Sequence, residues 1–225
     1  MLWFCSLWLI FVYLPICHWI WGGGWLAKMG VMDFAGGIVI HVNAGVAALV
    51  SALVLGKRKG FPHVAMPPHN MTMVVTGAGM LWVGWFGFNG GSALTSDGHA
   101  GMAILVVAGL GTITPASGFV GPLGGFVIGL VAGVVCFYAT QIVKRKFKID
   151  DSLDVFPVHG VGGVIGSLLT AVFAATEFGG LGLSQGVSIS HQMGVQALAI
   201  TTTAIWSGAL SYGILKLIDA LIGLR

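Results

Sequence analysis

The sequence predicts an all-α protein, a polytopic bundle of transmembrane helices. Of its 225 residues, 56% are hydrophobic and only 8% are charged, whereas an average soluble domain carries roughly 25% charged residues. The few charges separate apolar runs long enough to cross a bilayer core, which takes ~20 helical residues. The chain lacks the alternating segments of a membrane barrel. Backbone hydrogen bonds within the hydrocarbon therefore have to be closed inside helices.

Seven apolar runs are the candidate spans of a single transmembrane domain, residues 1–225. In chain order they are 3–21, 34–56, 71–95, 101–119, 121–143, 156–176 and 192–215. The first run differs from a signal peptide because it has no basic start, is too long and is rich in tryptophan. We interpret it as a mature helix with an aromatic end at the membrane interface. The 37 glycines favour close packing of neighbouring helices.

Two basic clusters predict the orientation. Residues 57–59 (KRK) and 144–148 (KRKFK) both belong in the cytoplasm by the positive-inside rule. The net charge of +3 comes from such clusters and not from a basic face that could hold nucleic acid. An even number of crossings must separate the clusters, yet three runs lie between them. Either one run is re-entrant or the chain lacks a helix.

Two similar segments indicate an inverted repeat with a site at the interface of its halves. Asp33 opens one helix and is followed by His41 in DFAGGIVIHVNAG, and Asp154 opens another and is followed by His159 in DVFPVHGVGGVIG. An aspartate is favourable at the positive end of a helix dipole. A chance match of two such pairs is the alternative.

His41 and His159 are the first functional candidates, because ionisable side chains inside apolar spans tend to face a cavity or a partner. Two neutral imidazoles can hydrogen-bond each other and still offer a nitrogen to a small polar guest. The alternative is a pair of structural core histidines. A metal site would need further ligands, and none repeats nearby at helical spacing, so we expect no metal and no other cofactor.

Residues 84–92 (GWFGFNGGS) form a second candidate site at the outer end of their helix. Aromatic rings attract a cation, a hydroxyl can accept its hydrogen bond, and glycines let the backbone approach a lumen. An interfacial aromatic belt is the alternative. Cys5, Cys17 and Cys136 lie singly in apolar runs and indicate packing only. No nucleophile and base pair, phosphate loop or paired carboxylates occur, so we do not expect an enzyme.

Several segments, in order along nearly the whole chain, resemble the ammonium transporter family. They are DFAGGIVIHVNAG, GKRKGF, PPHN, GWFGFNGGS, TPASGFVG, DDSLDVFPVHGVGG and WSG in the last helix. The resemblance implies a homotrimer in the cell membrane with one pore in each subunit. It further implies that His41 and His159 line that pore as a pair.

The same resemblance implies roles for four more residues. Trp21 and Ser92 match the outer site that recruits ammonium, and Phe88 matches one ring of the phenylalanine gate beneath it. Asp33 matches a buried aspartate that supports the recruiting site. The implied mechanism is recruitment of NH₄⁺, loss of a proton at the gate, and passage of NH₃ past the histidines, with or without separate proton transfer. A dry lumen makes an intact cation costly, so K⁺, which has no proton to lose, is refused.

The chain departs from the family pattern in three places. It starts at what resembles the fourth of eleven helices, without the second phenylalanine of the gate. It stops where a cytoplasmic tail would begin, and that tail is a surface the family uses with PII-type signal proteins. Between Ser92 and TPASGFVG it is short by about one helix, roughly thirty residues. We therefore expect that the chain alone does not form a complete pore. The alternatives to transport are a non-conducting ammonium sensor and an inactive fragment.

Overall fold

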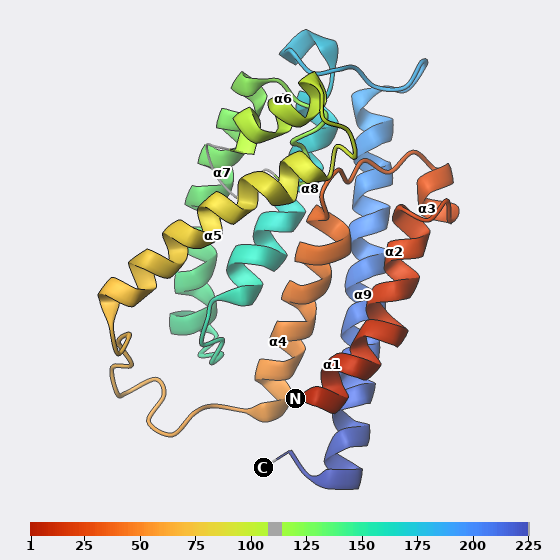
Figure 1. Cartoon of the computed structure of the whole chain (residues 1–225). Coiled ribbons are helices and arrows are strands. Elements are labelled where there is room, and N and C mark those ends of the chain that lie inside the picture. The colour runs from red at the N-terminus through yellow and green to blue at the C-terminus, as the bar shows by residue number, and fades with distance from the viewer. Residues whose placement is uncertain (108–113, 225) are drawn as a thin grey trace.

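The computed structural model describes residues 1–107 and 114–224, and the regular structure in these ranges is helical (Figure 1). Six helices of the described part are long and apolar enough to cross a membrane. They are Leu2–Lys28, Gly37–Leu55, Met71–Gly91, Pro122–Lys146, Phe156–Phe173 and Ile189–Ile222. Their lengths meet the ~20 residues that a bilayer core requires.

Several of these spans are built from consecutive helical pieces. The first joins α1 (Leu2–Trp8), η1 (Leu9–Tyr13) and α2 (Leu14–Ile20), with the short α3 (Trp25–Lys28) after a turn. The next joins η2 (Gly37–Val42) to α4 (Asn43–Leu55), and the fifth joins η5 (Phe156–Val161) to α8 (Gly162–Phe173). The pieces η1, η2, η4 (Ile142–Lys146) and η5 are π-helical. π-Helical turns are rare overall but are often found at functional sites. The π-helical pieces η2 and η5 contain His41 and His159, which supports these residues as site candidates.

The remaining helices are α5 (Met71–Gly91), α6 (Gly98–Val107), α7 (Pro122–Gln141), the 3₁₀ turn η6 (Thr176–Phe178) and α9 (Ile189–Ile222). The helix α9 extends along the molecule beside the α1–α2 run and α4 (Figure 1). The main apolar core lies between these elements, with Val12, Ile16, Val39 and Ile200 among its buried members. The η2–α4 element is thereby enclosed on the side of α9.

The range 101–119 is not one continuous helix. Residues 98–107 are helical in α6 and residues 114–119 form turns, while residues 108–113 lie outside the described residues. Pro115 and Gly118 interrupt any helix through the second part, because proline removes a backbone donor and glycine is a poor helix former. In the described part, α5 and α7 are then the two long helices between the basic clusters, an even number that allows both clusters to lie at one end.

Both basic clusters do lie at one end. The Arg58 guanidinium forms an ion pair with the buried carboxylate of Asp150, with Nη2 to Oδ1 at 2.7 Å and Nε to Oδ2 at 2.9 Å. The backbone N–H of Arg58 also donates to Asp150, at 2.7 Å. The connection before α5 is thus tied to the connection after η4.

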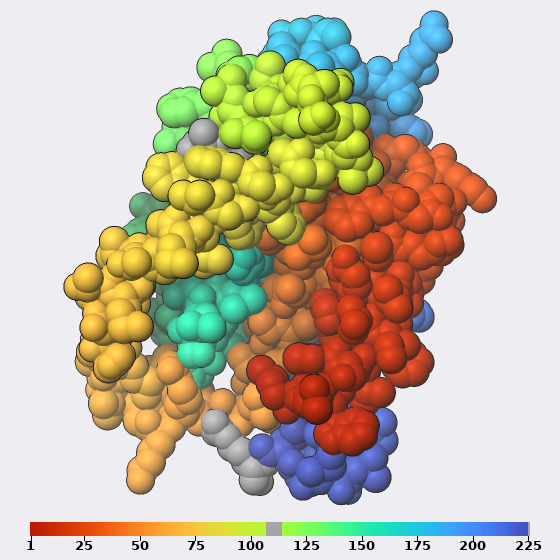
Figure 2. All heavy atoms as spheres, in the orientation of Figure 1, coloured from red at the N-terminus to blue at the C-terminus, as the bar shows by residue number. Residues whose placement is uncertain are grey.

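The helix α5 is the least enclosed of the long helices. It crosses the front of the molecule at an angle, and its atoms are largely uncovered there (Figures 1 and 2). None of the residues in its most apolar window is buried. Only its C-terminal end, with Asn89 and Gly90, is buried against neighbouring elements.

Candidate functional site: a histidine pair at a helix crossing

The η2 helix starts on an aspartate cap. Asp33 is buried, and its carboxylate accepts the backbone N–H groups of Gly36, Ile38 and Val39 at 2.9–3.1 Å. These are donors that a helix start leaves without a partner. Gly36 has a φ of 101°, a left-handed conformation that glycine adopts without strain. The local sequence therefore fixes where η2 begins, and His41 follows one to two turns later.

The second segment repeats this arrangement, but with a different aspartate from the one predicted. Asp151 accepts the N–H groups of Val155 and Phe156 at 3.1 and 2.7 Å. Asp154 lies directly before this helix, as predicted, and its carbonyl accepts the N–H of Val158 at 3.0 Å, but its carboxylate forms an ion pair with Lys144 at 2.7 Å and does not cap the helix. In both segments the histidine then follows the capping aspartate by eight residues and lies in a π-helical stretch.

Glycines let the two segments cross at close range. A Cβ added to Gly45 would collide with the backbone of Gly160, and one added to Gly163 would lie 2.6 Å from the carbonyl oxygen of Gly37. Gly37 and Gly45 thus oppose Gly163 and Gly160, so the segments run in opposite directions. Such contacts between small residues allow membrane helices to approach closely.

The crossing brings the two histidines together. Nδ1 of His41 lies 2.9 Å from Nδ1 of His159, and the ring planes differ by 4°. One ring must donate and the other accept, so the pair holds at least one Nδ1 proton. His41 is buried, and its Nε2 has no hydrogen-bond partner in the described part of the chain. The pair therefore keeps a free hydrogen-bonding nitrogen in a buried place.

Aromatic rings from α5 cover His41. The ring of Trp85 stacks on it with centroids 5.6 Å apart, and the ring of Phe88 lies 6.5 Å away. Trp85 and Phe88 are three residues apart and so share one face of α5. Phe88 was predicted as a site residue. Trp85 was missed as an individual residue, although the spacing to Phe88 was a usable signal.

The C-terminal end of α5 is fixed by the turn that contains TPASGFVG. Trp85 Nε1 donates to the hydroxyl of Thr114 at 3.2 Å, and Asn89 Nδ2 donates to the hydroxyl of Ser117 at 2.7 Å. The backbone N–H of Phe34 donates to the carbonyl of Pro115 at 3.1 Å, which ties the same turn to the Asp33 loop. The aromatic cover over His41 therefore has a rigid support.

Trp21 and Ser92 occupy more exposed positions. The Trp21 side chain is 41% exposed, and its Nε1 donates to the carbonyl of Asp33 at 2.7 Å. The Ser92 hydroxyl donates to the carbonyl of Phe88, one turn earlier, at 2.8 Å. In the described residues neither a hydrogen bond nor a ring contact joins Trp21 to Ser92. Trp21 is, however, hydrogen-bonded to Asp33, which caps the helix of His41. Ser92 is hydrogen-bonded to Phe88, whose ring lies near His41.

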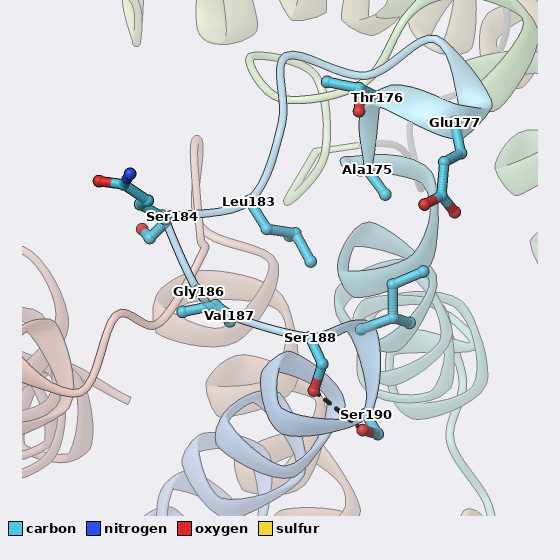
Figure 3. A pocket seen from close by; sticks show the side chains of 11 residues that line it. Ala175, Thr176, Glu177, Leu183, Ser184, Gly186, Val187, Ser188 and Ser190 are labelled. Atoms are coloured by element: carbon cyan, nitrogen blue, oxygen red, sulfur yellow. Dashed lines mark hydrogen bonds between the residues drawn. The ribbon is translucent and has the colours of Figure 1, made fainter.

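A large surface hollow lies elsewhere. A cavity of ≈ 570 Å³ is lined by residues of η6 and of the connection to α9, including Glu177, Ser188 and Ser190 (Figure 3). It contains neither histidine of the pair. Among the described residues no group of three His, Cys, Asp or Glu side chains could hold a metal ion.

Comparison with known proteins gives the family. The model of the Ammonium Transporter Family matches residues 1–107 and 101–225. The chain belongs to the ammonium transporter family. It is 42% identical to the ammonium transporter Amt1 of Archaeoglobus fulgidus, an alignment that covers 98% of this chain and 64% of that relative.

Solved structures of family members agree with the fold. The crystal structure of Saccharomyces cerevisiae Mep2 has a TM-score of 0.85 at 34% identity, covering 99% of this chain and 60% of that one. A structure described as a sensor Amt protein has a TM-score of 0.83 at 32% identity, covering 93% of this chain and 62% of that one. Together with the six apolar helices, these matches show an integral, multi-pass membrane protein. The relatives are named as transporters, not as enzymes.

This chain covers only part of the length of its relatives. It spans less than two thirds of the length of the Amt1 relative and of Mep2. The Amt1 alignment runs over 253 residues although this chain has 225, so the relative holds residues inside the matched region that this chain lacks. The two parts of the family match meet at residues 101–107, within α6. The break lies in the stretch where the sequence predicts a missing helix.

Proposed function

We propose that this chain carries the conduction site of an ammonium or ammonia transporter of the cell membrane. In this proposal Trp21 and Ser92 recruit NH₄⁺, Phe88 belongs to the gate, and NH₃ passes the His41–His159 pair. Asp33 supports the recruiting site through the carbonyl that Trp21 binds. The observation that carries the proposal is the close pair of imidazoles, with one buried nitrogen that has no partner among the described residues.

The chemistry follows from the hydrogen bond between the rings. If Nδ1 of His41 donates, its Nε2 is a lone-pair acceptor that can bind an N–H of ammonia. If His159 donates instead, the Nε2 of His41 carries a proton and becomes a donor. To pass from the first state to the second, the Nδ1 proton moves from His41 to His159, the Nε2 of His159 releases a proton, and the Nε2 of His41 takes one up. The pair can thus bind a neutral guest and also relay a proton, because both tasks use the same uncharged rings.

The aromatic cover explains why a neutral guest is favoured. The rings of Trp85 and Phe88 lie against His41 and cover it with largely apolar surface. Burying an ion without its hydration shell is far more costly than burying a neutral polar molecule that finds one hydrogen bond. An ammonium ion becomes a neutral molecule when it loses a proton before it reaches the histidine pair, whereas K⁺ has no proton to lose.

The test is flux through the purified chain in proteoliposomes, measured with radiolabelled methylammonium. Full transport by the native chain would refute the expectation that the chain alone does not form a complete pore, and the pore variants are compared with whatever flux the native chain shows. His41→Ala and His159→Ala should each abolish flux or change its selectivity, and His69→Ala, in the exposed cytoplasmic connection, should do neither. Flux with unaltered rate and selectivity in both pore variants would defeat the proposal. A homotrimer and binding of a PII-type signal protein remain predictions of the family resemblance, to be tested by crosslinking and by co-purification.

A second candidate function is ammonium sensing without conduction. It is favoured by the likeness to a protein described as a sensor Amt protein and by the segment that this chain lacks relative to its relatives. The chain would then bind ammonium at Trp21 and Ser92 without passing it on. Calorimetric binding of ammonium by a chain that shows no methylammonium flux would support this second function. Flux above that of empty liposomes would exclude it.

A further inference from the structure

A buried glutamine of α9 holds the loop that carries Asp33. The Gln196 side chain is fully buried, its Oε1 accepts the backbone N–H of Met32 at 2.9 Å, and its Nε2 donates to the carbonyl of Met32 at 2.8 Å. The same Nε2 lies 3.1 Å from the carbonyl of Ser167 on α8. Gln192, one turn earlier, donates to the carbonyl of Gly30 at 2.9 Å. One side chain thus satisfies both backbone groups of Met32.

This support matters because Met32 lies between two regular elements. Residues 31–36 are outside any helix, so the backbone groups of Met32 have no helical partner. A buried backbone group that loses its partner costs about 1–3 kcal/mol. Without the Gln196 amide the loop would have to move until Met32 found other partners.

Both halves of the proposed site depend on the residue next to Met32. The carbonyl of Asp33 accepts the indole N–H of Trp21, and its carboxylate accepts the N–H groups of Ile38 and Val39 at the start of η2. A shift of the Met32–Asp33 backbone would therefore move the Trp21 ring. It would also rotate the first turn of the helix that carries His41.

We propose that Gln196 is a positioning residue for ammonium recruitment. It acts through the backbone of Met32 and Asp33 and has no contact with the permeant species. The inference rests on the proposed recruiting role of Trp21. No sequence signal marks Gln196 as part of the site, since a glutamine on a long apolar helix is usually interpreted as a packing or helix–helix contact.

The first test is Gln196→Met, which keeps the volume and removes all four hydrogen bonds of the side-chain amide: two with Met32, one with Ser167 and one from Gln192. In proteoliposomes of the full chain we expect the half-saturation concentration for methylammonium to rise about tenfold, the worth of one or two such bonds, while the maximal rate stays within about twofold. Ser211→Ala is the matched control, because Ser211 is equally buried on α9 and binds Trp8 instead. An unchanged half-saturation in Gln196→Met would overturn the inference, as would an equal rise in Ser211→Ala.

Amide hydrogen exchange separates this inference from the proposed function. In nanodiscs, Gln196→Met should speed exchange in residues 29–40 and leave residues 205–222 unchanged. Gln196→Asn, whose amide is one methylene short, should give a smaller change of the same kind and serves if the methionine variant does not fold. Unchanged exchange at residues 29–40 in the folded variant overturns the positioning role, whether or not the native chain conducts. Absence of native flux, with faster exchange in the variant, would defeat conduction and leave the positioning role standing.

Discussion

The two segments that meet at the histidine pair share one backbone plan and differ in what surrounds it. Each has an aspartate cap, a histidine eight residues later and a crossing glycine twelve residues after the aspartate, Gly45 in one and Gly163 in the other. We refer to them as the Asp33 segment (residues 33–45) and the Asp151 segment (residues 151–163). Because each crossing glycine meets the partner segment, the two halves form one local pseudo-two-fold arrangement.

Their supports are of different chemistry. The Asp33 segment is held by neutral hydrogen bonds, from Gln196 on α9 and from the Pro115 turn. The Asp151 segment is flanked by two ion pairs, Arg58–Asp150 and Lys144–Asp154. Lysine and arginine ends stay near water, whereas amide groups can be satisfied in an apolar surrounding. The same kind of cap is thus supported by ion pairs at the end of the bundle that carries the basic clusters, and by neutral hydrogen bonds at the other segment.

A substitution at the crossing of the two segments should cause the largest loss of stability. In Gly45→Val the new side chain would meet the backbone of Gly160, which cannot move aside as a flexible side chain could. We expect a loss of about 3 kcal/mol or more, enough to prevent recovery of folded protein. Size-exclusion chromatography and thermal unfolding in detergent measure this loss.

Gly77→Val on α5 is the matched control, because in the described part of the chain no atom other than the nearby backbone of α5 itself lies within 4 Å of a Cβ built at Gly77. It should fold and elute like the native chain. Equal behaviour of the two variants would show that the segments do not need their close approach.

The loss of stability on removing each aspartate cap should follow the number of backbone hydrogen bonds that the cap accepts. Asp33→Ala leaves three backbone N–H groups without an acceptor and Asp151→Ala leaves two. We expect losses of about 2–3 and about 1–2 kcal/mol respectively. The second is smaller because Asp151 accepts fewer N–H groups and because Val155 and Phe156, which donate them, are only partly buried. Apparent melting temperatures of the two variants, measured side by side in detergent, test the order. The reverse order would mean that the Asp151 segment is the more tightly closed of the two.

These differences mark the limit of what the sequence predicts. Apolar runs predicted the helical membrane fold and basic clusters its orientation, because both are local consequences of the lipid solvent. Asp154 does lie at the start of its helix, but the capping role of the Asp151 carboxylate was not predicted. Both aspartates precede the same helix, and Lys144, which binds the Asp154 carboxylate, lies ten residues earlier on another helix. Gln196 could not be assigned, since its partner Met32 is 164 residues away. Long-range partners of polar side chains are decided by packing, which a single sequence does not display.

The ion pair of Arg58 gives the smallest expected effect and the clearest dependence on pH. The hydrogen bonds from the Arg58 guanidinium hold the pKa of Asp150 below its usual value. A carboxyl whose folded pKa is lowered contributes stability above its unfolded pKa, about 3.9, and this contribution is lost as the pH falls through the folded pKa. Arg58→Gln should therefore destabilise the chain at pH 5–8 by under about 1 kcal/mol, since the guanidinium is partly exposed.

The deficit of Arg58→Gln should then shrink as the pH falls below about 4, because the native chain loses the same ion pair there. It should also shrink at high salt, which screens the exposed side of the pair. Lys57→Gln is the control, because Lys57 is adjacent and has no ion pair in the described part of the chain. Melting temperatures of the three chains between pH 3 and pH 8 provide the measurement. A deficit that persists unchanged at the lowest pH would assign the stabilising role of Arg58 to packing of its stem and not to the charge of Asp150.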